Sequence, residues 1–517
     1  MKQIRALRGI VAAALLAAAL GACSPDEPPS DPERNAAAAP TGRELGQRLV
    51  DAMGGRAALE RVQSLVLRGS GTRTRMGQIA ETGGEDPTGT LTSVTETIDL
   101  ANGRAGFDYD VTVGDFTQHR TEVFTTHNGM RVGWNTGPGR PVIVTSPDGI
   151  FSWATQNTPE MLLRRNVLTV ALAAASGGTD EPAERRTFAG RESLYATARL
   201  PSGEEIGLHF DPQTSLLLGF TALDTETMLG DVEAEYALDD WRTVRDVLLP
   251  HSVTITKQGR PYSSIEYDSI AINNTAALAL LEIPDEAVEQ AEEVVAAGGS
   301  WSPLAWNEVA PGVYHAVGYS HHSMVVEFPS FVVVVEAPYT DAQSATLARL
   351  VEENLGKPIR YVVPSHPHYD HTGGLRGIVA TGATAVLAAG HEAELRAVIE
   401  APHTNPPDAL ARRRAAGEGF GAIEVLAGSR TIEEGDRALE LYEVETIPHV
   451  RPKVLAYVPH ARAVFQSDLF FGGPSPDAEA LYEALRERER ELEVELIVGG
   501  HGGVLPFAAL EEAVGGE

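Results

Sequence analysis

The pattern of apolar and polar residues changes several times along the chain, beginning with an apolar run over residues 10–20. Three cations, Lys2, Arg5 and Arg8, precede this run. A helix that crosses a membrane needs about 20 apolar residues, so the run is too short to span and has the length of the central region of a secretory signal peptide. We therefore expect residues 1–22 to be a signal peptide.

The next segment, residues 23–40, is rich in Pro, Ala and acidic residues and has no large apolar residue. Such a composition cannot bury a core, so it predicts a disordered tether. Folded structure is expected to begin near residue 41. Over residues 43–57, Leu45, Leu49 and Met53 have helical spacing before a pair of glycines stops the helix.

From residue 63 to about residue 274, apolar and polar residues alternate with period two, and turn residues interrupt the pattern. Stretches such as SLVLRGSGTRT, RAGFDYDVTV and YSSIEYDSIAIN are typical of half-buried antiparallel strands. Within this region, only residues 159–175 have the pattern of a further helix. We therefore predict an α+β domain over residues 41–283, built on a large curved antiparallel sheet with helices packed on it.

A different pattern follows the acidic stretch 284–300, which is expected to be an interdomain helix and linker. Short apolar strands (MVVEF, FVVVVEA, IRYVVPS, TAVLAA) now alternate with helical stretches at residues 342–355, 375–380 and 391–399. This alternation is typical of α/β layering, in which helices cover sheets. The chain is therefore expected to have two folded domains, the second over residues 301–517.

Composition and charge narrow the partners. At 517 residues the chain is too long for one ordinary core, which agrees with two domains. Lys and Arg number 41 against 72 Asp and Glu, a net charge of −31. An acidic surface repels nucleic acid phosphate, so we expect a small-molecule substrate and no nucleic acid. The oligomeric state stays open.

The single cysteine, Cys23, lies directly after Leu20-Gly21-Ala22. This run resembles the lipobox of bacterial lipoproteins, in which the cysteine is diacylated and becomes the new N-terminus. The alternative is an ordinary secretory signal with a chance cysteine. The resemblance implies a lipid-anchored protein of the bacterial cell envelope, in contact with the membrane through its anchor. It also leaves no thiolate for a disulfide or a metal site.

The first domain opens with DAMGGRAALERVQSLVLRGSG and closes with YALDDWRTVRDVLLPHSVTI. These stretches resemble envelope domains of the lipoprotein-carrier (LolA-like) kind. The resemblance implies that the curved sheet of residues 41–283 is a half-barrel with helices packed in it.

Candidate chemistry is concentrated in residues 365–374, SHPHYDHTGG, at the end of a predicted strand. In an extended segment the period of two places His366 and His368 on the same side, where both imidazoles can reach one metal ion. Asp370 and His371 follow where the chain turns into a helix, and they can reach a neighbouring second ion. One motif can therefore serve two metals.

This H-x-H-x-D-H run resembles the signature of the metallo-β-lactamase superfamily, and the resemblance extends over about residues 301–507. It implies an αββα sandwich and three further ligands, for which His449, Asp468 and His501 follow later strands in the required order. By this resemblance, the first metal is held by His366, His368 and His449, and the second by Asp370, His371 and His501, with Asp468 bridging the two. Zinc is the expected metal, although nitrogen and oxygen ligands also suit iron or manganese.

The resemblance further implies a hydrolase in which a hydroxide on two zinc ions attacks an ester, thioester, lactone, amide or phosphodiester. Asp370 is the candidate catalytic residue, because it could orient the attacking water and accept its proton. Two alternatives remain open. One is a β-lactamase in the strict sense, and the other is an envelope carrier that binds a lipid or another ligand and has a secondary metal domain.

Weaker signals lie around this motif. His321 and His322 precede an apolar strand; they either line the cleft or are solvated, and we expect them to be solvated. Residues 412–414 are three consecutive arginines, which either meet an anionic substrate or form a solvated helix face. Tyr369 lies inside the motif, but its position is one that often packs away from the metals.

Overall fold

The structure is a computed structural model that describes residues 39–515 except 82, 115, 129, 136–142, 146–157, 297–303, 319–320, 406 and 489–491. The predicted signal peptide, nearly all of the predicted tether and Cys23 lie outside the described residues. Residues 40–517 belong to one compact unit. Within the described part of the chain, no helix has both the length and the apolar character needed to cross a bilayer.

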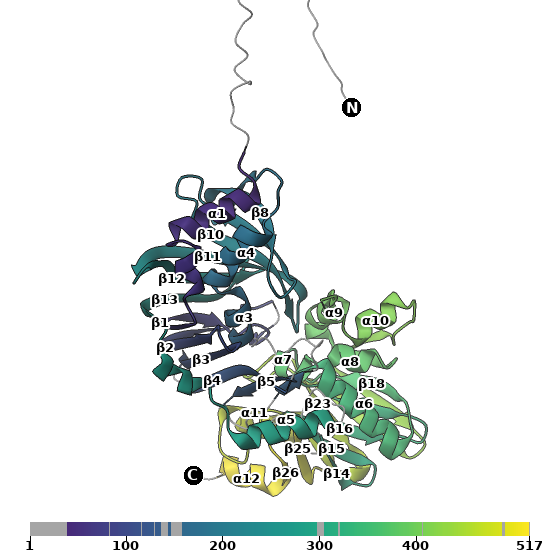
Figure 1. Cartoon of the computed structure of the whole chain (residues 1–517). Helices are drawn as coiled ribbons and strands as arrows, with labels where there is room; N and C mark the ends of the chain where they lie inside the picture. Colours follow the sequence, from purple (N-terminus) through teal and green to yellow (C-terminus); the bar gives the residue numbers. More distant parts are fainter. Residues whose placement is uncertain are drawn as a thin grey trace, which may run out of the picture. The chain divides into compact units, whose positions relative to one another are not determined.

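The first region contains one large antiparallel sheet with the strand order β6-β5-β4-β3-β2-β1-β13-β12-β11-β10-β9-β8-β7 (Figure 1). Its strands are β1 (Ser64–Thr74), β2 (Thr88–Asp99), β3 (Arg104–Val113), β4 (Phe116–His127), β5 (Met130–Asn135), β6 (Ile143–Thr145), β7 (Glu184–Phe188), β8 (Arg191–Arg199), β9 (Glu205–Phe210), β10 (Leu217–Glu226), β11 (Gly230–Val244), β12 (Val247–Lys257) and β13 (Arg260–Ile272). The first and last of the long strands pair, since Leu65 of β1 lies opposite Ile272 of β13. On its other side β1 pairs with β2, where Leu65 lies opposite Ile98. The large antiparallel sheet predicted from the period-two pattern is confirmed.

Glycines in β1 allow its neighbours to approach closely. The register shifts between Arg68 and Gly69, and a Cβ on Gly69 would lie 1.9 Å from the carbonyl oxygen of Glu266 on β13. Gly71 is equally close to the carbonyl oxygen of Ser264. Glycine in a strand interior often marks such a bulge or close backbone contact.

Helices cover this sheet at several points. They are α1 (Gly42–Ala52), α2 (Arg56–Glu60), α3 (Thr158–Arg165), α4 (Val167–Gly177), the 3-10 helix η2 (Thr275–Leu281) and α5 (Asp285–Ala296). A capping box between Thr41 and Glu44 starts α1. The helix predicted over residues 159–175 is instead two helices, because the Asn166 side chain accepts from the Thr169 backbone and starts α4 anew.

The second region contains two mixed sheets. The first has the order β14-β15-β16-β17-β18-β19-β20, and the second has the order β21-β22-β23-β24-β25-β26. Their strands are β14 (Ala305–Ala310), β15 (Val313–Val317), β16 (His322–Glu327), β17 (Val332–Val335), β18 (Ile359–Val363), β19 (Thr384–Ala388), β20 (Ile423–Leu426), β21 (Ser429–Glu434), β22 (Arg437–Val444), β23 (Lys453–Val458), β24 (Ala463–Ser467), β25 (Leu496–Gly499) and β26 (Val504–Pro506).

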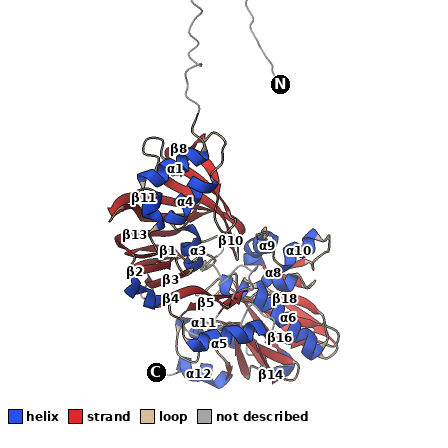
Figure 2. Cartoon of the chain, in the orientation of Figure 1, coloured by secondary structure: helices blue, strands red, loops and turns tan. Residues whose placement is uncertain are grey.

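These two sheets share one core, in which Val333 and Val386 of the first sheet pack with Leu441 and Phe465 of the second. Separate apolar clusters join each sheet to helices, which Figure 2 shows in blue beside the red strands. The helices and short 3-10 segments are α6 (Asp341–Leu355), α7 (Tyr369–Thr372), α8 (Leu375–Val379), η3 (Ala389–His391), α9 (Glu392–Glu400), α10 (Ala409–Ala415), η4 (Pro459–Ala461), α11 (Pro476–Arg488) and α12 (Phe507–Gly515).

Strand direction decides which residues can meet at one end of each sheet. β17, β18 and β19 are parallel, so their C-terminal ends lie at one edge of the first sheet. β16 is antiparallel to β17, so its first residues lie at that same edge. In the second sheet, β23 runs antiparallel to both β22 and β24, so the start of β23 lies beside the ends of its neighbours.

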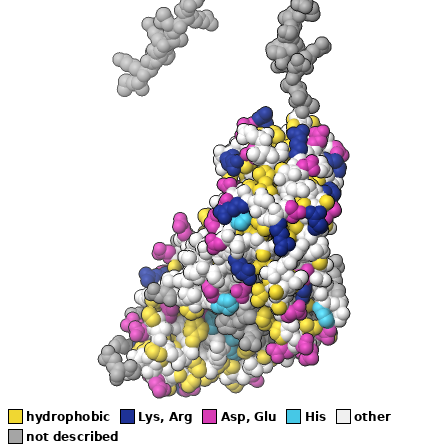
Figure 3. All heavy atoms as spheres, turned by 60° about the vertical axis from the view of Figure 1, so that its left-hand side comes forward, with side chains coloured by type: hydrophobic (Ala, Val, Ile, Leu, Met, Phe, Trp, Pro, Cys, Tyr) yellow, Lys and Arg dark blue, Asp and Glu magenta, His cyan; other side chains and the backbone are white. Residues whose placement is uncertain are grey.

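Charged side chains are spread over the surface rather than gathered by sign on the face that Figure 3 shows, where Asp and Glu side chains lie among Lys, Arg and apolar ones. On this face the acidic excess of the chain is therefore distributed.

Candidate metal centre

The seven residues predicted as metal ligands come from separate parts of the chain, and the structure brings them together. They are His366 and His368 after β18, Asp370 and His371 in α7, His449 after β22, Asp468 after β24 and His501 after β25. The glycines that follow the motif allow α7 to pack tightly, because a Cβ on Gly373 would lie 2.0 Å from the carbonyl oxygen of Tyr339. Glycine is thus needed at position 373, where α7 ends against the main chain of Tyr339.

The first group of candidate ligands consists of His366, His368, His449 and Asp468, whose ligand atoms all lie within 4.8 Å of one another. Oδ2 of Asp468 is 2.7 Å from Nε2 of His449 and 3.7 Å from Nε2 of His366. The His366 side chain is fully buried, whereas His449 is 29% exposed and is the member of this group most open to solvent. A small molecule would therefore approach from the His449 side.

The second group consists of His321, Asp370, His371 and His501, again with ligand atoms within 4.8 Å of one another. Nε2 of His371 is 3.9 Å from Oδ2 of Asp370 and 3.5 Å from Oδ2 of Asp468. Asp468 thus lies between the two groups, with one oxygen close to histidines of both. This position suits a carboxylate that bridges two metal ions.

The expectation that His321 and His322 are solvated is wrong. Their exposed fractions are 5% and 4%, and Nε2 of His321 donates a hydrogen bond of 2.9 Å to Oδ2 of Asp370. The reason is strand direction, since the start of β16 lies at the same edge as the end of β17. His322 faces the other way, and its ring packs against His315 with a centroid separation of 4.9 Å.

The donor set fits a metal ion. Nε2 of His366, His371 and His449 is buried in each case and makes no hydrogen bond with the described residues. Buried polar atoms are nearly always paired, so three imidazole nitrogens without such a bond around one carboxylate oxygen indicate a site that a cation completes. Imidazole and carboxylate ligands suit zinc and also iron or manganese.

Glu336 orients part of this centre, and the sequence analysis missed it. This fully buried residue after β17 accepts from Nδ1 of His371 at 2.9 Å and from the hydroxyls of Ser365 and Ser467. A carboxylate that holds one imidazole nitrogen leaves the other directed at the metal. Glu336 has a φ of +65°, a conformation that costs about 1–3 kcal/mol and is kept only where neighbouring contacts enforce it. The available signal was an acidic residue at the end of a run of four valines.

Lys453 is a second buried residue that the sequence analysis missed. As the first residue of β23 it has an exposed fraction of 0%, and its ammonium group pairs with Oδ1 of Asp468. This contact leaves Oδ2 of Asp468 for the histidines. Burial raises the pKa of Asp468, but Lys453 and the nearby histidines outweigh burial and hold it well below its usual value. A cation at the start of the apolar strand KVLAYV was the signal.

Burial also sets the charge of the histidines. It lowers the pKa of His368 to about 3 and that of His501 to about 2, so both imidazoles are neutral at pH 7, as metal ligation requires. His371 differs, because Glu336, Asp370 and Asp468 outweigh burial and raise its pKa well above the usual value. A positive charge is thus favoured at His371, where a bound metal ion would supply it.

A loop of the antiparallel region reaches the metal centre. Between β1 and β2, the carbonyl oxygen of Gly77 accepts from the Tyr369 backbone at 2.9 Å, and that of Ile79 accepts from Nε2 of His368 at 2.9 Å. Nε2 of Gln78 donates to Oδ1 of Asp370 at 2.7 Å. No sequence pattern indicates these contacts, because they join residues about 290 positions apart, and two of the three involve main-chain atoms.

Two weaker candidates lie outside both groups. Tyr369 packs against the β1–β2 loop, where a Cβ on Gly77 would lie 3.1 Å from its own Cβ. The three arginines of α10 make local contacts: Arg412 donates to the Pro407 carbonyl, Arg413 to the Gly419 carbonyl, and Arg414 lies over the Phe420 ring. The structure does not bring these arginines to the metal ligands.

A cavity of about 1180 Å³ lies in the same unit, apart from the metal ligands. One wall is the face of the antiparallel sheet that carries Leu65 and Leu67, with α3 beside it. The other wall includes residues from the start of α6, from α8 and from α10. Further apolar residues line it, namely Ile98, Phe107, Phe220, Leu238, Leu249, Val253, Ile255, Ile265 and Ile270.

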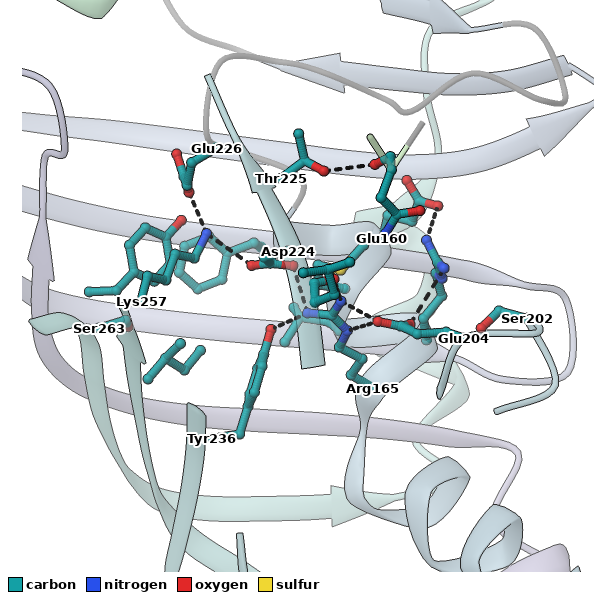
Figure 4. Close-up of a pocket in the computed structure, with 18 of the residues that line it drawn as sticks. Glu160, Arg165, Ser202, Glu204, Asp224, Thr225, Glu226, Tyr236, Lys257 and Ser263 are labelled. Atoms are coloured by element: carbon teal, nitrogen blue, oxygen red, sulfur yellow. Dashed lines mark hydrogen bonds and ion pairs between the residues drawn. The ribbon is translucent and has the colours of Figure 1, made fainter. Parts of the chain in front are cut away.

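A network of paired charges lies in the wall of this cavity (Figure 4). Arg165 donates to Glu204 at 2.9 Å, to Asp224 at 2.7 Å and to the hydroxyl of Tyr236 at 2.9 Å. Lys257 pairs with Asp224 at 3.1 Å and with Glu226. Both cations therefore have carboxylate partners inside the protein.

Comparison with known proteins gives a family for part of the chain. The model of the metallo-beta-lactamase superfamily matches residues 316–501, a span that contains all seven predicted ligands and His321. The search of curated proteins gave no significant match.

Among solved structures, a metallo-β-lactamase from Pontibacter korlensis is 16% identical, with 41% of this chain and 97% of that chain covered and a TM-score of 0.31. A mono-zinc metallo-β-lactamase from Pseudomonas aeruginosa is 19% identical, with 41% and 94% covered and a TM-score of 0.30. One from Hirschia baltica is 15% identical, with 41% and 96% covered and a TM-score of 0.29. On the match of the family model, residues 316–501 are a domain of the metallo-β-lactamase superfamily.

Proposed function

We propose that the protein is a metal-dependent hydrolase with two metal ions, zinc by preference, in the superfamily domain. The observation that carries this proposal is the pair of histidine-rich groups that share Asp468. His366, His368 and His449 would hold the first ion, and Asp370, His371 and His501 the second. Bound metal ions of this kind polarise a carbonyl or phosphoryl oxygen and make water acidic enough to react near pH 7.

The residues around the ions have distinct parts in this proposal. Lys453 holds one oxygen of Asp468, so the other oxygen is fixed between the two groups. Glu336 fixes the orientation of His371, and the carbonyl of Ile79 fixes that of His368. These contacts hold the ligands in place before substrate binds, which lowers the cost of reaching the reactive geometry.

Asp370 is the proposed catalytic residue. Its side chain is 17% exposed, against 7% for Asp468, so a substrate or water can reach it more easily. Burial raises the pKa of Asp370, but His371 and His321 outweigh burial and hold it well below its usual value, so the carboxylate stays ionised at neutral pH. An ionised carboxylate at this position can orient a nucleophilic water and accept its proton. The proposed substrate class is an ester, thioester, lactone, amide or phosphodiester.

The test uses the chain from residue 24 onward, which lacks the predicted signal peptide and the lipidated cysteine. We expect about two metal ions per chain after reconstitution with zinc. A panel of a β-lactam, a lactone, a thioester, an aryl ester and an aryl phosphodiester should include at least one hydrolysed substrate, with activity removed by a chelator and restored by zinc. Hydrolysis of the β-lactam alone would assign the strict β-lactamase. A reconstituted protein that binds no metal would overturn the proposal.

A second candidate function is favoured by the cavity. We propose that the antiparallel region is a LolA-like half-barrel that carries an apolar ligand, because many aliphatic and aromatic side chains of the sheet line the cavity. Substitution Leu67→Trp would fill part of it, whereas Phe116→Trp changes a side chain that is 67% exposed on the same sheet. A fluorescent long-chain fatty acid should bind the unmodified chain and the Phe116→Trp variant more tightly than Leu67→Trp. Equal binding by all three would reject the cavity as the binding site.

We also propose that the protein is lipid-anchored in the bacterial envelope through Cys23. The support is the lipobox resemblance and the position of the only cysteine. Substitution Cys23→Ser should release the protein from the membrane fraction and abolish labelling with a radioactive fatty acid. Membrane retention of the variant, with no label on the unmodified protein, would reject the anchor.

A further inference from the structure

We propose that His321 is itself a ligand of the second metal ion, so that this ion is held by three histidines and Asp370, beside the shared Asp468. The inference rests on the proposed function, because it needs a metal in the second group. It adds to the ligand set that the H-x-H-x-D-H motif implies, which contains only His371 and His501 as histidines of the second ion.

The position of His321 carries the proposal. Its ligand atom lies within 4.8 Å of those of Asp370, His371 and His501, and the ligand atoms of the first group lie within the same distance of one another. The imidazole ring is 3.6 Å from that of His501 and 5.0 Å from that of His371, measured between ring centroids. Three imidazoles therefore surround one point, with Asp370 as the fourth group.

The hydrogen bond of His321 also points to a ligand. Nε2 of His321 donates to Oδ2 of Asp370, whereas Gln78 takes Oδ1. Oδ2 is the oxygen that faces His371, so His321 and Asp370 share a proton at the place where their atoms approach the rest of the group. A metal ion that displaces this proton would be bound by both residues.

Main-chain contacts keep His321 in this place. The carbonyl oxygen of His321 accepts from the Gln343 side chain at 3.2 Å, and the backbone of the next residue, His322, donates to the Gly500 carbonyl at 2.7 Å. Gly500 directly precedes His501, so the main chain of β16 and the loop that carries His501 are joined. The hydrogen bond between His322 and Gly500 thus fixes the imidazoles of His321 and His501 relative to each other.

An additional imidazole has a chemical consequence. Each ion then has three histidines and the shared Asp468, and the second ion has Asp370 in addition. The second ion has one coordination position fewer for water or substrate than the motif alone implies. Two similar donor sets should also bind the same kind of metal with more similar affinities than an unequal pair would.

The experiment compares His321→Ala with His322→Ala in the chain from residue 24 onward. His322 is the matched control, because it is the neighbouring buried histidine but belongs to neither group. Zinc stoichiometry and affinity are measured by competition with a chromophoric chelator. The visible spectrum of the cobalt derivative and the number of imidazoles per metal from X-ray absorption report the ligands directly.

We expect His322→Ala to behave as the unmodified chain. His321→Ala should keep the first ion, lose about ten-fold or more in affinity for the second, and show a changed cobalt spectrum and fewer imidazoles per ion. His321→Asn is measured in parallel, because its smaller change in packing preserves the fold if the alanine variant does not fold.

Two results would overturn the proposal. Unchanged affinities and spectra would show that His321 binds no metal. A weaker second ion with an unchanged imidazole count would show that His321 only positions Asp370. Failure of the proposed function is distinguishable from both, because then the unmodified chain itself would bind no metal.

Discussion

The metal centre and the cavity wall both bury charged and polar groups, but they satisfy these groups differently. In the metal centre, Nε2 of His366, His371 and His449 is buried without a hydrogen bond to the described residues. In the cavity wall, Arg165 and Lys257 are paired with three carboxylates, and Asp224 is shared by both cations. The metal centre contains Lys453 and still leaves these three nitrogens without a hydrogen bond to the described residues, whereas both cations of the cavity wall have carboxylate partners.

Burying an uncompensated charge costs several kcal/mol, so the source of compensation indicates what each region binds. By the proposed function, a positive ion from solution would complete the metal centre. Both cations of the network around Asp224 already have carboxylate partners inside the protein, so they need no anionic ligand. The apolar part of the cavity lining remains for an apolar ligand. Similar residue types therefore predict different ligands, according to whether their partners are inside the protein.

The largest expected effect concerns Asp370 in the metal centre. Asp370→Asn keeps the size of the side chain and removes its charge, so kcat should fall about 10²–10⁴-fold with a smaller change in KM. Asp436→Asn, at an exposed turn, is the control. Rates on any accepted substrate and the metal content of each variant are measured together. Near-normal turnover in a fully metallated Asp370→Asn variant would show that Asp370 is only a ligand.

Breaking the ion pairs of Lys257 in the cavity wall should destabilise the fold. Lys257→Met leaves Glu226 and Asp224 buried with less compensation, which should cost about 3–5 kcal/mol of unfolding free energy. Arg199→Met removes an ion pair that is 62% exposed on both sides and should cost about 0–1 kcal/mol. Urea unfolding of both variants measures the difference. An equal loss of unfolding free energy in the two variants would show that burial does not make the Lys257 pairs more important than an exposed ion pair.

Glu96 is a buried carboxyl in the cavity wall. Burial raises the pKa of Glu96 from 4.5 to about 7, against opposing contributions from Tyr267 and Arg73. Above pH 4.5 the unfolded chain has lost this proton and the folded chain keeps it, so stability falls as pH rises to about 7 and is level beyond.

Glu96→Gln removes this dependence. Relative to the unmodified chain, the variant should gain up to about 3 kcal/mol between pH 4.5 and 7. Thermal unfolding midpoints across that range provide the measurement, with Glu205→Gln, an exposed carboxyl, as the control. A constant difference between Glu96→Gln and the unmodified chain at every pH would contradict the expectation.

The smallest expected effect concerns the loop that the antiparallel region contributes to the metal centre. Gln78→Ala removes one hydrogen bond to Asp370 and should weaken the second ion by about ten-fold, with the first ion unchanged. Gln47→Ala, on an exposed face of α1, should change neither ion. Metal titration distinguishes the two. An unchanged second ion in Gln78→Ala would mean that the loop only packs against the domain.

The sequence predicted the part of the centre that is local. His366, His368, Asp370 and His371 lie within six residues, and period-two geometry together with the following turn explains how they share a site. Lys453 was not predicted, and for His321 the solvated alternative was favoured over a place in the cleft, although one rule places both residues. Each lies at or next to the start of a strand that runs antiparallel to a neighbour, and that neighbour ends at the edge where the ligands lie. Strand order, which the sequence does not show, was needed to apply the rule.

The antiparallel sheet was predicted from alternation alone, but its cavity was not. Alternation shows which side chains share a face, as Leu65 and Leu67 do, and says nothing about whether that face is filled. The break at Asn166 was also missed, because a capping asparagine inside a helical pattern looks like an ordinary polar residue. The main-chain contacts of Gly77 and Ile79 leave no trace in side-chain chemistry.

The loop between β1 and β2 also makes the two regions thermodynamically linked. A ligand that binds only the native state stabilises it by about 2.7 kcal/mol at a free concentration 100 times its dissociation constant. Gln78 and Ile79 are hydrogen-bonded to Asp370 and His368. Metal binding that stabilises the native metal centre should therefore also stabilise the loop and the two strands that carry it. Chelation should therefore lower the melting temperature of the antiparallel region, although none of its described residues is a proposed metal ligand. The two halves should unfold in one cooperative transition when metal is bound.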